Sequence, residues 1–179
     1  MAEVGPASLR VKYLLGGLAP DSDLPMPVET QDMIRCHWQV IEKRVPGTRF
    51  NYDFWSACSP RRSTYPACRA VIAARNQETG MEEEMIRSIQ HAYYLQARNP
   101  SDDDVLMELA SRLGLDGERF RVDLNADRTQ EELASEIHAA QNMAVSSFPS
   151  LMLEADGRYL PVDIDYNDEN VMLQQIFAR

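Results

Sequence analysis

The dipeptide Asp156-Gly157, near the end of the chain, constrains the fold more than any other feature. Asp-Gly between two hydrophobic runs is a strong hairpin signal, because both residues readily adopt the positive φ angles of a two-residue turn. It predicts a strand over 150–154 and an antiparallel return strand over 158–164. A final amphipathic helix follows, whose hydrophobic positions are Val171, Met172, Leu173, Ile176 and Phe177.

Between residues 28 and 144 the sequence predicts mostly helices. Hydrophobic residues recur every three to four positions, and prolines and glycines separate the helical stretches. Ser101 with Asp104, and Thr129 with Glu132, match a capping-box pattern and predict helix starts, whereas Gly114 predicts a helix end. The predicted helices cover 28–44, 65–75, 81–98, 101–114, a short stretch around 118–125, and 129–144.

Two further segments add to this outline. Residues 8–15, with the sequence SLRVKYLL before Gly16-Gly17, predict a strand followed by a loop turn. Four aromatic residues cluster between the first two long helices, and we expect them to pack in the core rather than to bind a cofactor. They are Phe50, Tyr52, Phe54 and Trp55.

The composition excludes several classes of function. The 179 residues, 44% of them hydrophobic, fit one compact domain, and a formal net charge of −10 repels phosphate backbones, which argues against a nucleic-acid partner. No hydrophobic stretch approaches the roughly 18 residues of a membrane span, and the first residues lack the pattern of a signal peptide. We therefore expect a cytoplasmic protein with no membrane contact.

The segment Ser147-Phe148-Pro149 lies between a predicted helix end and a predicted strand start. Proline cannot donate a ladder hydrogen bond, so it belongs at the first position of a strand, where a cis bond can present backbone groups to an extended peptide. A simple helix-to-strand turn is the alternative. A proline loop, a strand, a hairpin and a terminal helix together match the C-terminal half of a thioredoxin fold.

Several segments resemble the bacterial DsbA-like protein-disulfide isomerases, over about residues 9–176. The resemblance implies an α/β, thioredoxin-like fold with a large helical insertion, and a Cys-X-X-Cys site facing the loop of Ser147, Phe148 and Pro149, which would bind substrate. It further implies a thioredoxin-like core in 1–26 and 129–179 and an insertion in 27–128. The matching segments are LLGGL (14–18), FNYDFW (50–55), RRSTYPACRA (61–70), AYYL (92–95), NPSDD (99–103), SFPSL (147–151) and DYND (165–168).

The sequence departs from this family at the catalytic centre, because no Cys-X-X-Cys occurs in the 179 residues. In the family that motif follows the first strand, so we expect an N-terminally truncated form lacking the first strand and first helix. Dithiol exchange needs a thiolate of lowered pKa and a second thiol beside it. Cys68 is expected to be buried and inert, whereas Cys36 and Cys58 are expected nearer the surface.

Three functions remain open at this point. The first is a thiol-disulfide oxidoreductase homologue that binds extended peptides without dithiol turnover. The second is a non-enzymatic binding or assembly protein, or a homo-oligomer, that uses exposed strand edges. The third is a glutathione-using relative of the same fold. We expect no cofactor and no metal site, because the three histidines, His37, His91 and His138, lie on separate helices.

Overall fold

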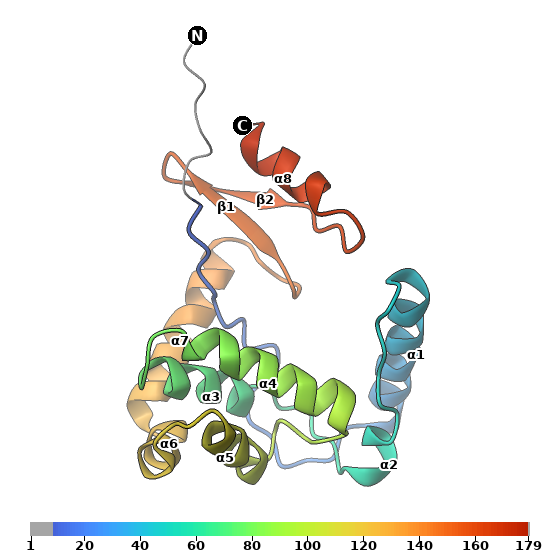
Figure 1. Ribbon diagram of the computed structural model, residues 1–179, viewed down its shortest axis with the longest axis vertical. Helices are drawn as coiled ribbons and strands as arrows, with labels where there is room; N and C mark the ends of the chain where they lie inside the picture. Colours follow the sequence, from blue (N-terminus) through green and yellow to red (C-terminus); the bar gives the residue numbers. More distant parts are fainter. Residues whose placement is uncertain (1–8, 179) are drawn as a thin grey trace.

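The computed structural model describes residues 9–178. Six helices form a helical block, α7 packs against α3 and runs on beyond the block, and the hairpin β1–β2 with α8 forms a C-terminal unit at the other end of the molecule (Figure 1). The block consists of α1 (Val28–Arg44), α2 (Phe54–Ala57), α3 (Tyr65–Arg75), α4 (Met81–Gln96), α5 (Asp103–Arg112) and α6 (Gly117–Leu124). The remaining elements are α7 (Asp127–Asn142), β1 (Leu151–Ala155), β2 (Arg158–Val162) and α8 (Glu169–Phe177).

Helix α3 is the centre of the helical block. Its residues 70–74 are at most 3% exposed, and their mostly small side chains let the neighbouring helices approach closely. Met85 of α4, Leu106 of α5 and Phe120 of α6 are fully buried against this core. The hydrophobic periodicity of the sequence thus predicts both the helices and the faces that they bury.

The aromatic residues between α1 and α3 form a second core. Trp38 of α1 is 3% exposed; its ring stacks on Phe50 at 4.8 Å and also meets Trp55 at 5.0 Å. Tyr93 and Tyr94 of α4 join this cluster. The prediction that Phe50, Tyr52, Phe54 and Trp55 pack in the core is confirmed.

Both predicted capping boxes are wrong, although the helices themselves are present. Helix α5 begins at Asp103, and the Ser101 hydroxyl donates instead to the Ser63 carbonyl at 2.6 Å. Helix α7 begins at Asp127, so that Thr129 lies inside its first turn and is 1% exposed. In the first case a distant backbone acceptor competes for the hydroxyl, and in the second the extended backbone of Ala126 already starts the helix.

The hairpin is confirmed at its predicted turn. Strands β1 and β2 pair antiparallel, from Leu151 opposite Val162 to Ala155 opposite Arg158. Asp156 and Gly157 have φ angles of 51° and 71°, the left-handed values of a two-residue turn. The Gln175 side chain of α8 accepts from the Asp163 amide and donates to its carbonyl, which joins α8 to the end of β2.

The predicted strand over 8–15 is wrong for the residues that the structure describes, and Ser8 lies outside them. Residues 9–17 form no strand. A strand needs a partner, and within residues 9–178 β1 pairs only with β2. The segment is tied to α7 instead, because the Leu15 amide donates to the Glu136 carboxylate at 2.8 Å. Within residues 9–178, no helix combines the length and the hydrophobicity that a membrane crossing requires.

Candidate functional site

The loop of Ser147, Phe148 and Pro149 lies fully at the surface, between α7 and β1. Helix α7 ends in a left-handed turn at Ala144, whose φ is 58°, and the Val145 amide returns to the Ala140 carbonyl. The Phe148–Pro149 peptide bond is cis. Strand β1 starts two residues after Pro149. The loop therefore leads directly into one edge of the hairpin.

The Phe148 ring packs closely against Gly16, a residue of the N-terminal part of the chain. A Cβ atom placed on Gly16 would lie 1.9 Å from Cε1 of Phe148, so only glycine leaves room for the ring in this position. The ring is still 43% exposed. Sequence reasoning treated Gly16 as part of a loop turn and missed this contact, for which the only signal was its place in a segment shared with the DsbA-like proteins.

Gly17 fixes the same segment against the helices. Its φ of 55° is left-handed, and an added Cβ would lie 2.3 Å from Cδ1 of Ile137 on α7. An added Cβ on Gly17 would also lie 2.9 Å from Cε1 of Tyr65, the first residue of α3. Residues 16 and 17 thus connect the Phe148 loop, α7 and α3 in one place.

The three cysteines form no paired site. All are free thiols; Cys36 is exposed, whereas Cys58 and Cys68 are partly buried. Burial raises the pKa of Cys68 to about 11. Burial, followed by the charge of Asp102, raises the pKa of Cys58. Neither Cys58 nor Cys68 has the lowered thiol pKa that a redox-active cysteine needs.

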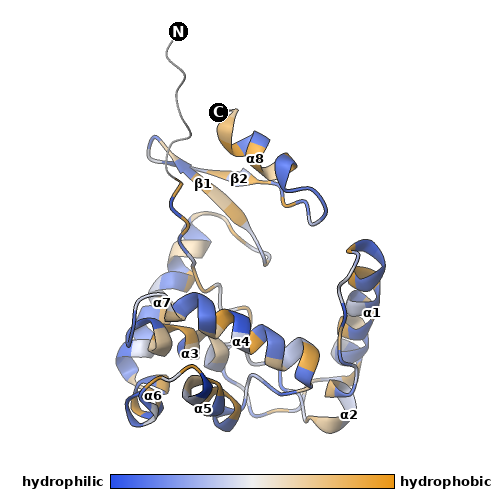
Figure 2. Ribbon diagram, viewed as in Figure 1, coloured by the Kyte–Doolittle hydropathy of each residue, from blue (hydrophilic) through white to orange (hydrophobic). Residues whose placement is uncertain are grey.

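Strand β1 has one unpaired edge among the described residues, because its partner β2 covers only the other. Elsewhere in the C-terminal unit, Tyr159 of β2 is 51% exposed and Phe177 of α8 is 50% exposed. Figure 2 shows hydrophobic stretches along β1 and α8, far from the core of the helical block. An unpaired edge beside an exposed ring can pair with an extended chain.

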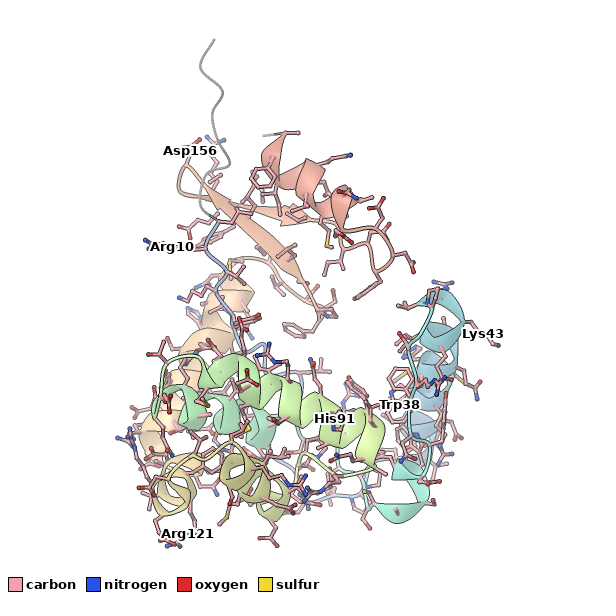
Figure 3. All side chains as sticks on the ribbon, in the orientation of Figure 1. Arg10, Trp38, Lys43, His91, Arg121 and Asp156 are labelled. Carbon is pink, nitrogen blue, oxygen red and sulfur yellow. The ribbon has the colours of Figure 1, made fainter. Side chains whose placement is uncertain are left out.

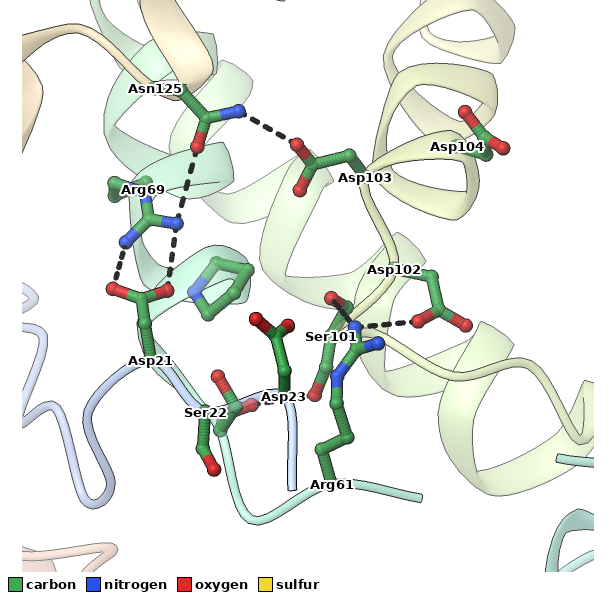
Figure 4. A pocket seen from close by; sticks show the side chains of 12 residues that line it. Asp21, Ser22, Asp23, Arg61, Arg69, Ser101, Asp102, Asp103, Asp104 and Asn125 are labelled. Carbon is green, nitrogen blue, oxygen red and sulfur yellow. Dashed lines mark hydrogen bonds and ion pairs between the residues drawn. The ribbon is translucent and has the colours of Figure 1, made fainter. Parts of the chain in front are cut away.

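A pocket of about 600 Å³ lies in the helical block and is strongly charged (Figure 4). Arg69 donates to both carboxylate oxygens of Asp21 at 2.8 and 2.9 Å, and Arg61 donates to Asp102 at 2.7 Å. Both arginines are therefore occupied by groups of the same chain. The Asp21–Arg69 pair holds the segment before α1 against α3, and the Arg61–Asp102 pair joins the segment before α3 to the start of α5, so their role is structural.

No group of three or more His, Cys, Asp or Glu side chains in residues 9–178 is arranged to hold a metal ion. The three histidines are exposed on α1, α4 and α7. Asp165 accepts hydrogen bonds from the amides of Asn167 and Asp168, which closes a turn before α8.

A proline loop before a β-hairpin and terminal helix, combined with a large helical block, defines a thioredoxin-fold protein of the DsbA-like type. The chain belongs to the thioredoxin family: the family profile described as Thioredoxin matches residues 25–158. The expectations of the family and of the helix-rich thioredoxin-like fold are confirmed.

Two solved structures are similar to this chain. A candidate protein disulfide isomerase from Nitrosomonas europaea has a TM-score of 0.74 at 21% identity, covering 90% of this chain and 78% of that one. The cytosolic disulfide reductase DsbM from Pseudomonas aeruginosa has a TM-score of 0.67 at 26% identity, covering 83% and 72%.

The curated relatives are named as protease adapter proteins rather than as disulfide isomerases or reductases. The ClpXP adapter protein SpxH of Bacillus subtilis is 28% identical over 136 residues, which are 73% of this chain and 45% of the relative. SpxH of Shouchella clausii is 27% identical over 51% of this chain and 31% of that protein. The chain thus matches less than half the length of these relatives.

Proposed function

We propose that this chain is a DsbA-type thioredoxin-family protein that binds extended peptides at Ser147, Phe148, Pro149 and the free edge of β1. We further propose that its own three cysteines carry out no dithiol turnover. The observation that carries the proposal is that the exposed Phe148–Pro149 loop runs directly into a strand whose other edge has no partner within residues 9–178.

The contacts of the loop support this proposal. The Phe148 ring packs against Gly16, and 43% of Phe148 stays exposed. The ring is therefore already positioned in the absence of a ligand. A peptide that pairs with β1 would satisfy backbone groups of the edge and could cover this ring. Binding of this kind depends on backbone hydrogen bonds and tolerates many side chains.

Peptide binding is tested with a blocked, cysteine-free peptide of alternating Val and Thr, followed by amide chemical shifts of the labelled chain. We expect shifts in the loop and in β1, and loss of binding when alternate peptide amides are methylated. Phe148→Ala should weaken binding about tenfold, because the ring is the nearest hydrophobic contact. Tyr159→Ala, which removes a similarly exposed ring on β2, is the matched control. Shifts confined to the helical block would contradict the proposal.

Dithiol turnover is tested separately, by reduction of insulin with dithiothreitol. The chain should not accelerate the reaction, because the pKa values of Cys58 and Cys68 are raised rather than lowered. Dithiol-dependent acceleration that disappears in Cys68→Ser would refute this part and leave the peptide-binding part intact. The expectation of an N-terminally truncated form is tested by the intact mass of the native protein.

A second candidate function is delivery of a bound protein to a protease, because the curated relatives are ClpXP adapter proteins. It uses the same peptide-binding loop without redox chemistry. If it holds, the chain should speed degradation of a peptide-tagged protein by ClpXP, and Phe148→Ala should remove the effect. Equal degradation rates with and without the chain would exclude it.

A cytoplasmic location forms part of the proposal. It is supported by the three free thiols and by the similarity to a cytosolic reductase. Fractionation of the native cells tests this location.

A further inference from the structure

A second pocket, of about 490 Å³, lies in the helical block between α4 and the segment that follows α1. Gly47, Thr48, Arg49 and Phe50 form one wall. The other wall comes from α4 and consists of Arg87, Gln90, His91, Tyr94 and Leu95. Figure 3 labels His91 on α4, and Trp38 on the neighbouring α1. The two walls come from elements that are distant in sequence and share the aromatic core beneath them.

The hydrophobic part of the pocket is rigidly supported. The Phe50 ring stacks on Trp38 with an angle of 12° between the planes and meets Tyr94 edge-on at 5.3 Å. Leu95, on the last turn of α4, is nevertheless 46% exposed. The Phe50 amide and the Tyr52 hydroxyl both donate to Glu42, which fixes the segment against α1. A ligand would therefore meet a preformed hydrophobic surface.

The charged part of the pocket is basic, in a chain whose net charge is −10. Arg49 and Arg87 line it, and no carboxylate does. Arg87 donates to Glu83 and Glu84 on its own helix, so its charge is partly offset. Arg49 is exposed and forms no ion pair within residues 9–178, nor do Lys43 and Arg44 at the end of α1. The free charge beside the hydrophobic surface is therefore positive.

We propose that this pocket binds an acidic peptide segment, with a large hydrophobic side chain against Phe50, Tyr94 and Leu95 and a neighbouring carboxylate on Arg49. A guanidinium binds a carboxylate through paired hydrogen bonds and can also lie flat on aromatic rings. The other large pocket differs in charge, because its lining contains five aspartates and its two arginines already bind two of them. The basic pocket is thus the one suited to an anionic partner.

The probe is the blocked peptide Glu-Glu-Phe-Glu-Leu-Glu, and binding to the full chain is measured by calorimetry and by amide chemical shifts. We expect shifts at 47–50 and along the second half of α4. Replacing every Glu of the probe by Gln should weaken binding about tenfold or more, because each charge-assisted hydrogen bond becomes a neutral one. Raising the salt concentration should weaken binding of the acidic probe more than that of the Gln probe.

Matched variants distinguish binding at this pocket from a general attraction between the acidic probe and surface arginines. Arg49→Gln combined with Arg87→Gln should weaken binding of the acidic probe about tenfold or more. The control is Arg62→Gln combined with Arg112→Gln: Arg62 is another exposed arginine, and Arg112 pairs with a glutamate on its own helix as Arg87 does. Leu95→Ala should weaken both the acidic and the Gln probe about threefold, since it removes only hydrophobic contact.

Three results would overturn the proposal: equal affinity of the Arg49/Arg87 double variant and the control, equal affinity for the Glu and Gln probes, or equally tight binding of inorganic phosphate. Phe148→Ala should leave binding of the acidic probe unchanged. The proposal for this pocket is therefore tested independently of the proposal for the peptide-binding loop.

Discussion

The helical block and the C-terminal unit differ in how they bury hydrophobic residues. In the block, α3 alone contributes five consecutive residues that are at most 3% exposed. In the C-terminal unit, α8 has no buried residue, and Val162 is the one buried hydrophobic residue of the hairpin. The block is therefore stabilised by its own core, whereas the C-terminal unit keeps much of its hydrophobic surface in contact with water.

This difference relates to function. A strand with a free edge has backbone N–H and C=O groups that no neighbouring strand pairs. A bound extended chain can pair with these groups and add a strand to the sheet. A well-packed helical block provides the rigid support from which the Phe148 loop is presented. If the proposed binding at the Phe148 loop holds, that binding and most of the core packing lie in different regions, and substitutions in the two regions should have different consequences.

The largest effect on stability should distinguish the helical block from the C-terminal unit. Phe120→Ala removes a fully buried ring from the helical block and should lower the free energy of unfolding by about 3–5 kcal/mol. Phe177→Ala removes a ring of α8 that is 50% exposed and should lower it by less than about 1 kcal/mol. Urea unfolding followed by circular dichroism measures both. Equal losses would show that the C-terminal unit is as well packed as the block.

A second pair of variants compares the polar contacts of the two regions. Arg69 is 6% exposed and donates to the Leu124 carbonyl, Asp21 and Gln130. Arg69→Gln should lower stability by about 2 kcal/mol, because the buried Leu124 carbonyl and the partly buried acceptors on Asp21 and Gln130 lose a charged donor. Gln175→Ala breaks the contacts between α8 and Asp163, which lie at the surface, and should lower it by less than about 1 kcal/mol. The same urea experiment applies, and the reverse order would contradict the comparison.

Sequence reasoning works where a local pattern alone determines the structure. The turn at Asp156 and Gly157, and the ends of α1 and α3, follow from periodicity and turn chemistry, and the structure has them where predicted. The two capping boxes failed for different reasons: the Ser101 hydroxyl has a distant acceptor, whereas α7 begins two residues before Thr129. Ser101 found an acceptor on Ser63, which is 38 residues away in the sequence.

The rest of the site depends on contacts between distant segments. The strand predicted at the N-terminal end had a suitable local sequence but, among residues 9–178, no neighbouring strand to pair with. The contact of Gly16 with Phe148 joins residues from opposite ends of the chain, and no spacing or periodicity points to it. The roles of Ser147, Phe148 and Pro149 in binding stay predictions that the peptide titration decides.

Helices α5 and α7 end in the same kind of turn but with different residues. In α5, Gly114 takes the left-handed position with φ 77°, whereas in α7 the equivalent residue is Ala144 with φ 58°. The returning hydrogen bonds are the same, from Leu115 to Ala110 and from Val145 to Ala140. Gly114→Ala should lower stability by about 1 kcal/mol and Ala144→Gly should raise it by a similar amount, because only glycine adopts this conformation without strain. Changes of the same sign in thermal unfolding would contradict this explanation.

The smallest change in stability is expected at the contact that joins the N-terminal segment to the loop. Gly16→Ala places a Cβ against the outer edge of the Phe148 ring, which is 43% exposed and can turn away into water. The free energy of unfolding should fall by less than about 1 kcal/mol, since a flexible side chain rather than the backbone moves. Peptide binding should nevertheless weaken about as much as in Phe148→Ala, because the ring no longer occupies its position beside β1. Normal peptide affinity in Gly16→Ala would show that the position of the ring does not matter, and binding would then have to depend on the strand edge alone.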